Sequence, residues 1–342
     1  MPDALKFDLT GRRIWIAGHA GMVGQALMRR LRREDCELLT VPRSVLDLRR
    51  QAEVEDWLAA ARPDAIIVAA ARVGGILANH SLPADFLFDN LAIAQNVIHG
   101  AWRTGVRRLL YLGSSCIYPR HAAQPVAEDA LLTGALEPTN EWYAVAKIAG
   151  LKLCDAYRRQ HGCDFISAMP TNLYGYGDNF DPLYAHVLPA LLARIDQARL
   201  AGSPSVPVWG SGRPRREFLF VDDLADALVL LLRRYDGPGH INVGTGEDVS
   251  IAELATMIAA EVGYHGRFAF DADKPDGTPR KLLDVRRIQA LGWRHATPLP
   301  EGIRLTYDWY RQQLAAGGLR GLPSNHAQAG AAQPGAPGQQ PA

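Results

Sequence analysis

The chain has 342 residues, enough for one large α/β domain or for a core domain with a smaller lobe. Its 37 basic and 36 acidic residues leave a formal charge of +1, so the overall charge gives no sign of a nucleic-acid or membrane partner. The four cysteines lack metal-ligand spacing and no run of about 18 apolar residues occurs, so we expect a metal-free protein of the reducing cytoplasm.

The first predicted element is a buried strand over residues 13–17, an apolar run that ends at a glycine. It leads into the turn Gly18-His-Ala-Gly-Met-Val-Gly24 and then into a helix over residues 25–33. Gly18 would make the tight turn, Gly21 would let a pyrophosphate approach the backbone, and Gly24 would let helix and strand pack closely. A strand, glycine turn and helix in this order favour a dinucleotide site over a turn without a ligand.

A second predicted strand, residues 36–41, is followed by Arg43 instead of the acidic residue that would hold the adenosine ribose of NAD. An arginine here can pair with the 2′-phosphate of NADP, so the position favours NADP(H). The alternative is a solvated surface arginine.

A strand predicted over residues 109–113 ends at Ser114, and a later helix carries Tyr143 and Lys147 on one face. The ammonium of Lys147 would stabilise a phenolate at Tyr143, so the phenol could exchange a proton near neutral pH. The Ser114 hydroxyl could hydrogen-bond the oxygen of a bound carbonyl. A tyrosine and a lysine four residues apart also occur by chance on amphipathic helices, so the glycine turn, as the site of a hydride donor, is what favours a catalytic trio.

Strands alternate with helices as far as residue 170, which predicts an α/β fold with a doubly wound parallel sheet of the Rossmann type and a smaller C-terminal α/β substrate lobe. We assign residues 10–178, with a return at about 216–246, to the dinucleotide-binding domain, and 179–215 with 247–314 to the lobe. Residues 315–342, rich in Gly, Ala, Pro and Gln, are expected to form a disordered tail. Further helices are expected over residues 85–103, 189–199, 250–262 (with Ser250 and Glu253 as a capping box) and 300–314. Further strands are expected over 64–71, 164–170, 206–209, 267–271 and 217–223, the last of which enters a helix that continues to about residue 234.

Together these motifs resemble the extended short-chain dehydrogenase/reductases, over roughly residues 10–312. Longer segments are similar to the GDP-L-fucose synthase family: Ala-Gly-His-Ala-Gly-Met-Val-Gly at 17–24, Leu-Gly-Ser-Ser-Cys-Ile-Tyr-Pro at 112–119 and Lys-Pro-Asp-Gly-Thr-Pro-Arg-Lys-Leu-Leu-Asp at 274–284. The resemblance implies NADPH-dependent 3,5-epimerisation and 4-keto reduction of GDP-4-keto-6-deoxy-D-mannose. It also implies a cytoplasmic homodimer.

The implied chemistry gives roles to two further residues. A ketone at C4 acidifies the protons on C3 and C5, so an enzyme that inverts both centres needs an additional base and acid. By the resemblance, Cys116 would remove these protons and His186 would return them on the opposite face, while Ser114 and Tyr143 hold the C4 oxygen. Without the resemblance, Cys116 is a small buried residue at a strand end and His186 a lone histidine at a helix start.

The resemblance also implies which residues bind the ligands. Alanine stands at position 20, where some family members have an arginine that adds to 2′-phosphate binding, so NADPH preference would rest mostly on Arg43 and be weakened. The residues expected to bind the GDP-sugar are Arg194, Trp209, Arg216, Asp276 and Lys281. The arginines can donate paired hydrogen bonds to a pyrophosphate, and the indole offers a flat apolar surface. The expected cofactor residues are Gly18, His19, Ala20, Gly21, Met22, Val23, Gly24, Arg43, Asp47, Leu48, Leu112, Gly113, Ser114, Ser115, Lys147, Pro170, Asn172, Leu173 and His186.

Two alternatives remain open. One is a related GDP-sugar 4-reductase, or a 4-epimerase that retains bound NAD; the other is a catalytically silent nucleotide-binding or scaffold protein. Deuterium exchange into C3 and C5 without NADPH would separate an epimerising enzyme from a plain reductase. An intact set of expected catalytic residues argues against the silent protein.

Overall fold

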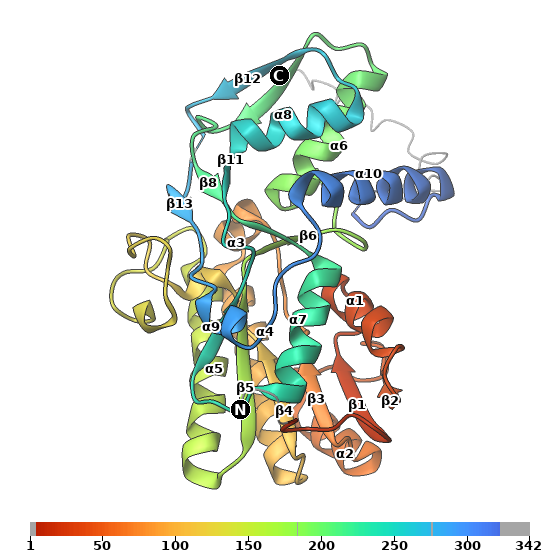
Figure 1. Ribbon diagram of the computed structural model, residues 1–342, viewed down its shortest axis with the longest axis vertical. Helices are drawn as coiled ribbons and strands as arrows, with labels where there is room; N and C mark the ends of the chain where they lie inside the picture. The colour runs from red at the N-terminus through yellow and green to blue at the C-terminus, as the bar shows by residue number, and fades with distance from the viewer. Residues whose placement is uncertain (1–4, 183, 275, 322–342) are drawn as a thin grey trace, which may run out of the picture.

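The computed structural model describes residues 5–182, 184–274 and 276–321, and a six-stranded sheet forms its centre (Figure 1). The strands lie in the order β2-β1-β3-β4-β5-β10, and every neighbouring pair is parallel. The expected doubly wound parallel sheet is therefore confirmed. Its strands are β1 Arg12–Ala17, β2 Cys36–Leu39, β3 Ala65–Val68, β4 Arg108–Leu112, β5 Asp164–Pro170 and β10 His240–Val243.

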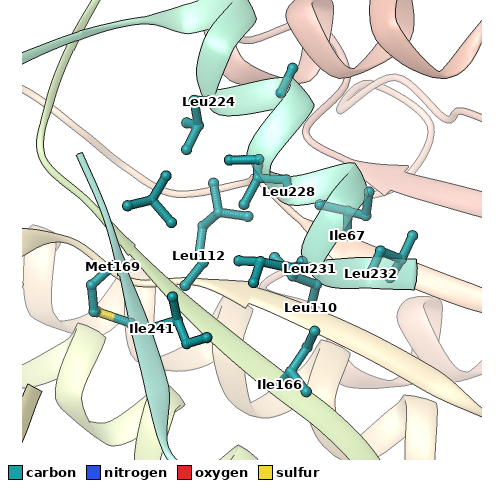
Figure 2. Packing of buried hydrophobic residues seen from close by; sticks show 14 of the residues in the cluster. Ile67, Leu110, Leu112, Ile166, Met169, Leu224, Leu228, Leu231, Leu232 and Ile241 are labelled. Atoms are coloured by element: carbon teal, nitrogen blue, oxygen red, sulfur yellow. The ribbon is translucent and has the colours of Figure 1, made fainter. Parts of the chain in front are cut away.

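Helices cover both faces of this sheet, which explains why its strands are continuous apolar runs in the sequence. In β1, Ile14 and Ile16 belong to the core shared with α1 and α7, whereas Trp15 belongs to the core shared with α2, α4 and α5. Figure 2 shows Leu224, Leu228, Leu231 and Leu232 of α7, spaced along one face of the helix, packed on side chains of the sheet such as Leu110 and Ile166. The covering helices are α1 Met22–Leu31, α2 Gln51–Ala61, α4 Pro83–Arg103, α5 Glu141–His161 and α7 Val221–Arg234, and the short α3 Ile76–Ser81 precedes α4.

A second hydrophobic core lies among α6, α8 and α10, above the sheet in Figure 1. The expected capping box opens α8, because Ser250 Oγ accepts a hydrogen bond from Glu253 N (3.1 Å) and Glu253 Oε2 accepts one from Ser250 N (2.7 Å). The helices here are α6 Val187–Leu200, α8 Ile251–Val262 and α10 Leu299–Ala316, with the short α9 Arg286–Ala290 beside the large sheet. The small strands are β6 Asn172–Tyr174 with β9 Phe218–Phe220, β7 Ser205–Trp209 with β12 Arg267–Asp271, and β8 Arg215–Arg216 with β11 Val249–Ser250 and β13 Arg280–Lys281.

The strand expected over residues 217–223 is too long. Only Phe218–Phe220 is extended, and α7 begins at Val221. Asp222 and Asp223 fall in the first helical turn, where carboxylates interact favourably with the positive end of the helix dipole.

At its end the chain keeps more structure than we expected of a tail. Helix α10 runs to Ala316, Gly317 closes it in the left-handed conformation (φ 68°), and the Leu319 side chain is buried. The remainder of the expected tail, residues 322–342, lies outside the described residues. Among the described helices, none has the length and apolar character needed to cross a membrane.

Candidate active site

A cavity of about 650 Å³ opens at the carboxyl ends of the parallel strands. The chain passes from β1 to β2 on one side and then to β3 on the other, so the strand order reverses beside β1. Ligands of open α/β sheets bind at such a switch point. The segments that follow β1, β3, β4 and β5 all contribute to the cavity wall, and every expected cofactor residue except Gly24 lines it.

The glycine turn has the shape that a dinucleotide requires. Gly18 has φ +93°, and a Cβ there would lie 2.7 Å from the Ala70 nitrogen. A Cβ on Gly24 would lie 2.2 Å from the Gly18 carbonyl oxygen, so this glycine lets helix and strand approach. At Gly21 the nearest atom would be 3.4 Å away, which leaves the side facing the cavity open, and α1 begins one residue later. The backbone amides of that first turn can therefore meet a phosphate group, and the turn fits the expected cofactor.

Three charged residues that the sequence did not predict, Arg49, Arg72 and Asp89, also line the cavity. Arg49 donates hydrogen bonds to Asp47 Oδ2 (2.6 Å) and to Asp89 Oδ1 (3.1 Å), and Arg72 donates to Asp89 Oδ2 (2.9 Å). The hydrogen bonds from Arg49 lower the pKa of Asp47 to about 2. Arg43 lies in the same wall with an exposed side chain and belongs to no ion pair in the described residues. It is thus a cation open to an anionic ligand.

Tyr143, Lys147 and Ser114 are brought together at the cavity, but the pKa of Tyr143 differs from the expectation. Lys147 Nζ donates a hydrogen bond to the Leu112 carbonyl oxygen (2.8 Å) and lies 5.8 Å from the centre of the Tyr143 ring. Burial lowers the pKa of Lys147 to about 8. Burial, and next the neighbouring Cys116, raise the pKa of Tyr143 well above its usual value, and the Ser114 hydroxyl only partly offsets this. The phenol is therefore a neutral hydrogen-bond and proton donor near pH 7.

Cys116 and His186 lie in different walls. Cys116 is buried and lines a second, small cavity together with Lys281, and Ser115 lines both cavities. Burial raises the pKa of the Cys116 thiol against the opposing charge of Lys281. His186 stands at the N-cap of α6 and lines the main cavity, where the surrounding protein and then the charge of Lys281 lower its pKa. Lys281 thus acts electrostatically on both residues.

The expected GDP-sugar residues form two groups, and none of them lines the main cavity. In the first group, Lys281 of β13 pairs in register with Arg216 of β8, and Arg216 Nη2 donates a hydrogen bond to the Asp276 carbonyl oxygen (3.3 Å). In the second group, the Arg194 guanidinium lies 5.9 Å from the centre of the Trp209 ring, which is half exposed. Burial lowers the pKa of Arg216 to about 10, so this arginine remains charged.

Comparison with known proteins shows the family to which the chain belongs. Residues 14–244 match the model of the NAD dependent epimerase/dehydratase family. The GDP-L-fucose synthase of Sinorhizobium fredii is 54% identical to this chain over 90% of the chain and 98% of its own length. The GDP-L-fucose synthase of Escherichia coli strain K12 is 53% identical over 88% and 97%. The crystal structure of a GDP-L-fucose synthetase from Naegleria fowleri bound to NADP has a TM-score of 0.85 and 27% identity, and the match covers 92% of this chain and 99% of that one.

Proposed function

Because the chain belongs to the NAD dependent epimerase/dehydratase family, and within it to the GDP-L-fucose synthases, we propose that it converts GDP-4-keto-6-deoxy-α-D-mannose to GDP-β-L-fucose. The observation that carries this proposal is the meeting of Ser114, Tyr143 and Lys147 at the cavity above the glycine turn. The test is product analysis by NMR after the chain is mixed with this keto-sugar and NADPH. A product reduced at C4 but not inverted at C3 and C5 would favour a 4-reductase, and no turnover would favour the silent protein.

The proposed site works on the sugar in two stages. Cys116 removes the protons on C3 and C5, and His186 protonates the opposite face of each carbon. Ser114 and Tyr143 donate hydrogen bonds to the C4 oxygen and stabilise the negative charge that develops there. NADPH, when bound along the glycine turn, supplies the hydride for C4. Tyr143 then gives its proton to the C4 oxygen, helped by the buried charge of Lys147 one helical turn away.

The pKa directions at Cys116 and His186 predict a flat pH profile for epimerisation. The resting pair is a neutral thiol and a neutral imidazole, while the reactive pair is a thiolate and an imidazolium, which together bind the same number of protons. The fraction of enzyme molecules with the reactive pair should therefore be independent of pH, at any pH between the lowered pKa of His186 and the raised pKa of Cys116. We expect the rate of deuterium exchange into C3 and C5, measured without NADPH, to vary by less than about twofold between about pH 6.5 and about pH 8. A tenfold rise per pH unit would mean that the thiolate alone limits the reaction.

Cofactor selectivity should depend on Arg43. Replacing Arg43 with alanine removes a charge-assisted hydrogen bond to the 2′-phosphate, so kcat/KM with NADPH should fall roughly tenfold while kcat/KM with NADH stays unchanged. Because position 20 is alanine, the unaltered chain should prefer NADPH by a modest factor, and equal efficiency with NADH would contradict the assignment. Arg33→Ala, at an exposed arginine outside the cavity, is the matched control.

For the assembly we propose a cytoplasmic homodimer that uses α4 and α5. Both helices expose large apolar side chains: Phe88 is 69% exposed on α4, and Trp142 and Val145 are 45% and 38% exposed on α5. Burying such a surface in a partner would stabilise the pair. Light scattering should give twice the chain mass of 37.4 kDa, and a monomer mass at micromolar concentration would contradict the dimer. Cell fractionation tests the compartment, and recovery outside the cytoplasm would contradict it.

A further inference from the structure

The C-terminal segment, residues 317–321, reaches back to the main cavity. After α10 ends, the buried Leu319 anchors the segment in the core shared by α6, α8 and α10. Phe180 N donates a hydrogen bond to the Arg320 carbonyl oxygen (3.0 Å). Arg320 lines the cavity, 134 positions after His186 in the sequence. This anchoring places a cation in the wall of the cofactor site.

Arg320 lies at the glycine-turn end of that site. Asp178 lines the same wall, and the charge of Arg320 opposes the rise that burial causes in the pKa of this carboxyl group, so the guanidinium must be near it. The residue before Asp178 lies on the first turns of α1: a Cβ on Gly177 would be 3.2 Å from Gln25 Oε1 and 3.5 Å from the Met22 Cα. Asp178 and Arg320 are therefore beside the helix N-terminus that can receive a pyrophosphate.

The electrostatic environment leaves Arg320 available to an anion. The Asp178 side chain is 3% exposed, and its Oδ1 accepts a hydrogen bond from Asn179 N (2.8 Å) while its Oδ2 has no partner. Burial raises the pKa of this carboxyl group to about 7 in spite of Arg320. The exposed Arg320 guanidinium forms no ion pair with any described residue. An acid with a pKa of about 7 is only partly ionised at neutral pH, so it cannot fully neutralise a nearby arginine.

We propose that Arg320 binds the pyrophosphate of the dinucleotide beside the α1 N-terminus, so that the C-terminal segment completes the cofactor site. A guanidinium suits this position because its planar N–H groups can bond two phosphate oxygens at once. The inference rests on the cofactor named in the proposed function. It gives a binding role to a residue that comes after the last helix and outside both expected domains.

The test compares dissociation constants for NADPH and NADH, measured by fluorescence titration without the sugar, in the unaltered chain and in Arg320→Ala. Because both cofactors share the pyrophosphate, both constants should rise by the same factor, roughly tenfold. Arg320→Lys keeps the positive charge but not the paired N–H donors of the guanidinium, so it should lose less affinity than Arg320→Ala. Arg311→Ala is the matched control, since Arg311 is exposed on α10, where it stacks on Tyr307, and does not line the cavity.

Two results would overturn this inference and leave the proposed function intact. One is an unchanged constant for both cofactors in Arg320→Ala, provided that the unaltered chain binds NADPH. The other is a loss confined to NADPH, which would place Arg320 at the 2′-phosphate with Arg43. If the unaltered chain binds neither cofactor, the proposed function fails and the inference fails with it. The thermal midpoint of Arg320→Ala without ligand, expected to equal that of the unaltered chain because the side chain is exposed, shows that affinity and not folding has changed.

Discussion

Replacing Tyr143 with phenylalanine should lower kcat for reduction of the keto-sugar by roughly 10²- to 10⁴-fold, the usual contribution of a positioned proton donor. The phenol is kept neutral by burial and by the neighbouring Cys116, so in the proposed mechanism its proton is available to the C4 oxygen as hydride arrives. Phenylalanine fills the same space and keeps the packing against Phe86, whose ring centre is 6.3 Å away. The variant should therefore fold and bind NADPH normally.

Stopped-flow measurement of NADPH oxidation gives the rate, and fluorescence titration gives the affinity for NADPH. The matched control is Tyr157→Phe on the same helix, where the hydroxyl bonds His99 Nδ1 (2.5 Å) away from the cavity. Reduction at an unchanged rate in Tyr143→Phe would remove this residue from its proposed role. A loss of NADPH affinity that accounts for the whole effect would give the residue a binding role instead.

The parts of the site that could be predicted from the sequence are those set by short-range geometry. The spacing of Gly18, Gly21 and Gly24 predicted a close turn, and the steric contacts at Gly18 and Gly24 explain why larger residues would not fit. Tyr143 and Lys147 share a face because they lie one turn apart on α5. The parallel sheet followed from apolar strands alternating with helices.

The remaining features depend on residues that meet only in the folded chain. The bond from Arg49 to Asp89 joins positions 40 apart, and no local pattern marks it. The pKa of Tyr143 depends on how much protein covers the ring, which helical spacing cannot supply. Arg320 stands in a stretch rich in glycine and alanine, where Leu319 is the single apolar anchor between Gly317 and Gly321. Composition does not reveal the effect of one such apolar residue, so it predicted a disordered tail.

Replacing Cys116 with serine should separate the two proposed reactions. Serine is nearly isosteric, but its hydroxyl has a far higher pKa than a thiol and is a poor base, so deuterium exchange into C3 and C5 should fall by roughly 10²- to 10⁴-fold. Tyr143, Lys147 and the glycine turn remain intact, so the C4 ketone should still be reduced when NADPH is present. The accumulated product should then keep the original configuration at C3 and C5.

We expect no such effect at a cysteine outside the two cavities. The control is Cys163→Ser, because Cys163 is also a free thiol but lies outside both cavities, and its replacement should leave the exchange rate unchanged. NMR of the sugar incubated in heavy water measures exchange, and NMR of the reduced product gives its stereochemistry. Exchange at a normal rate in Cys116→Ser would assign the base to another residue. Loss of both exchange and reduction, with NADPH affinity kept, would mean that only the epimerised ketone can be reduced. The Cys116 thiol would then be required for both reactions, because reduction at C4 could not begin before epimerisation.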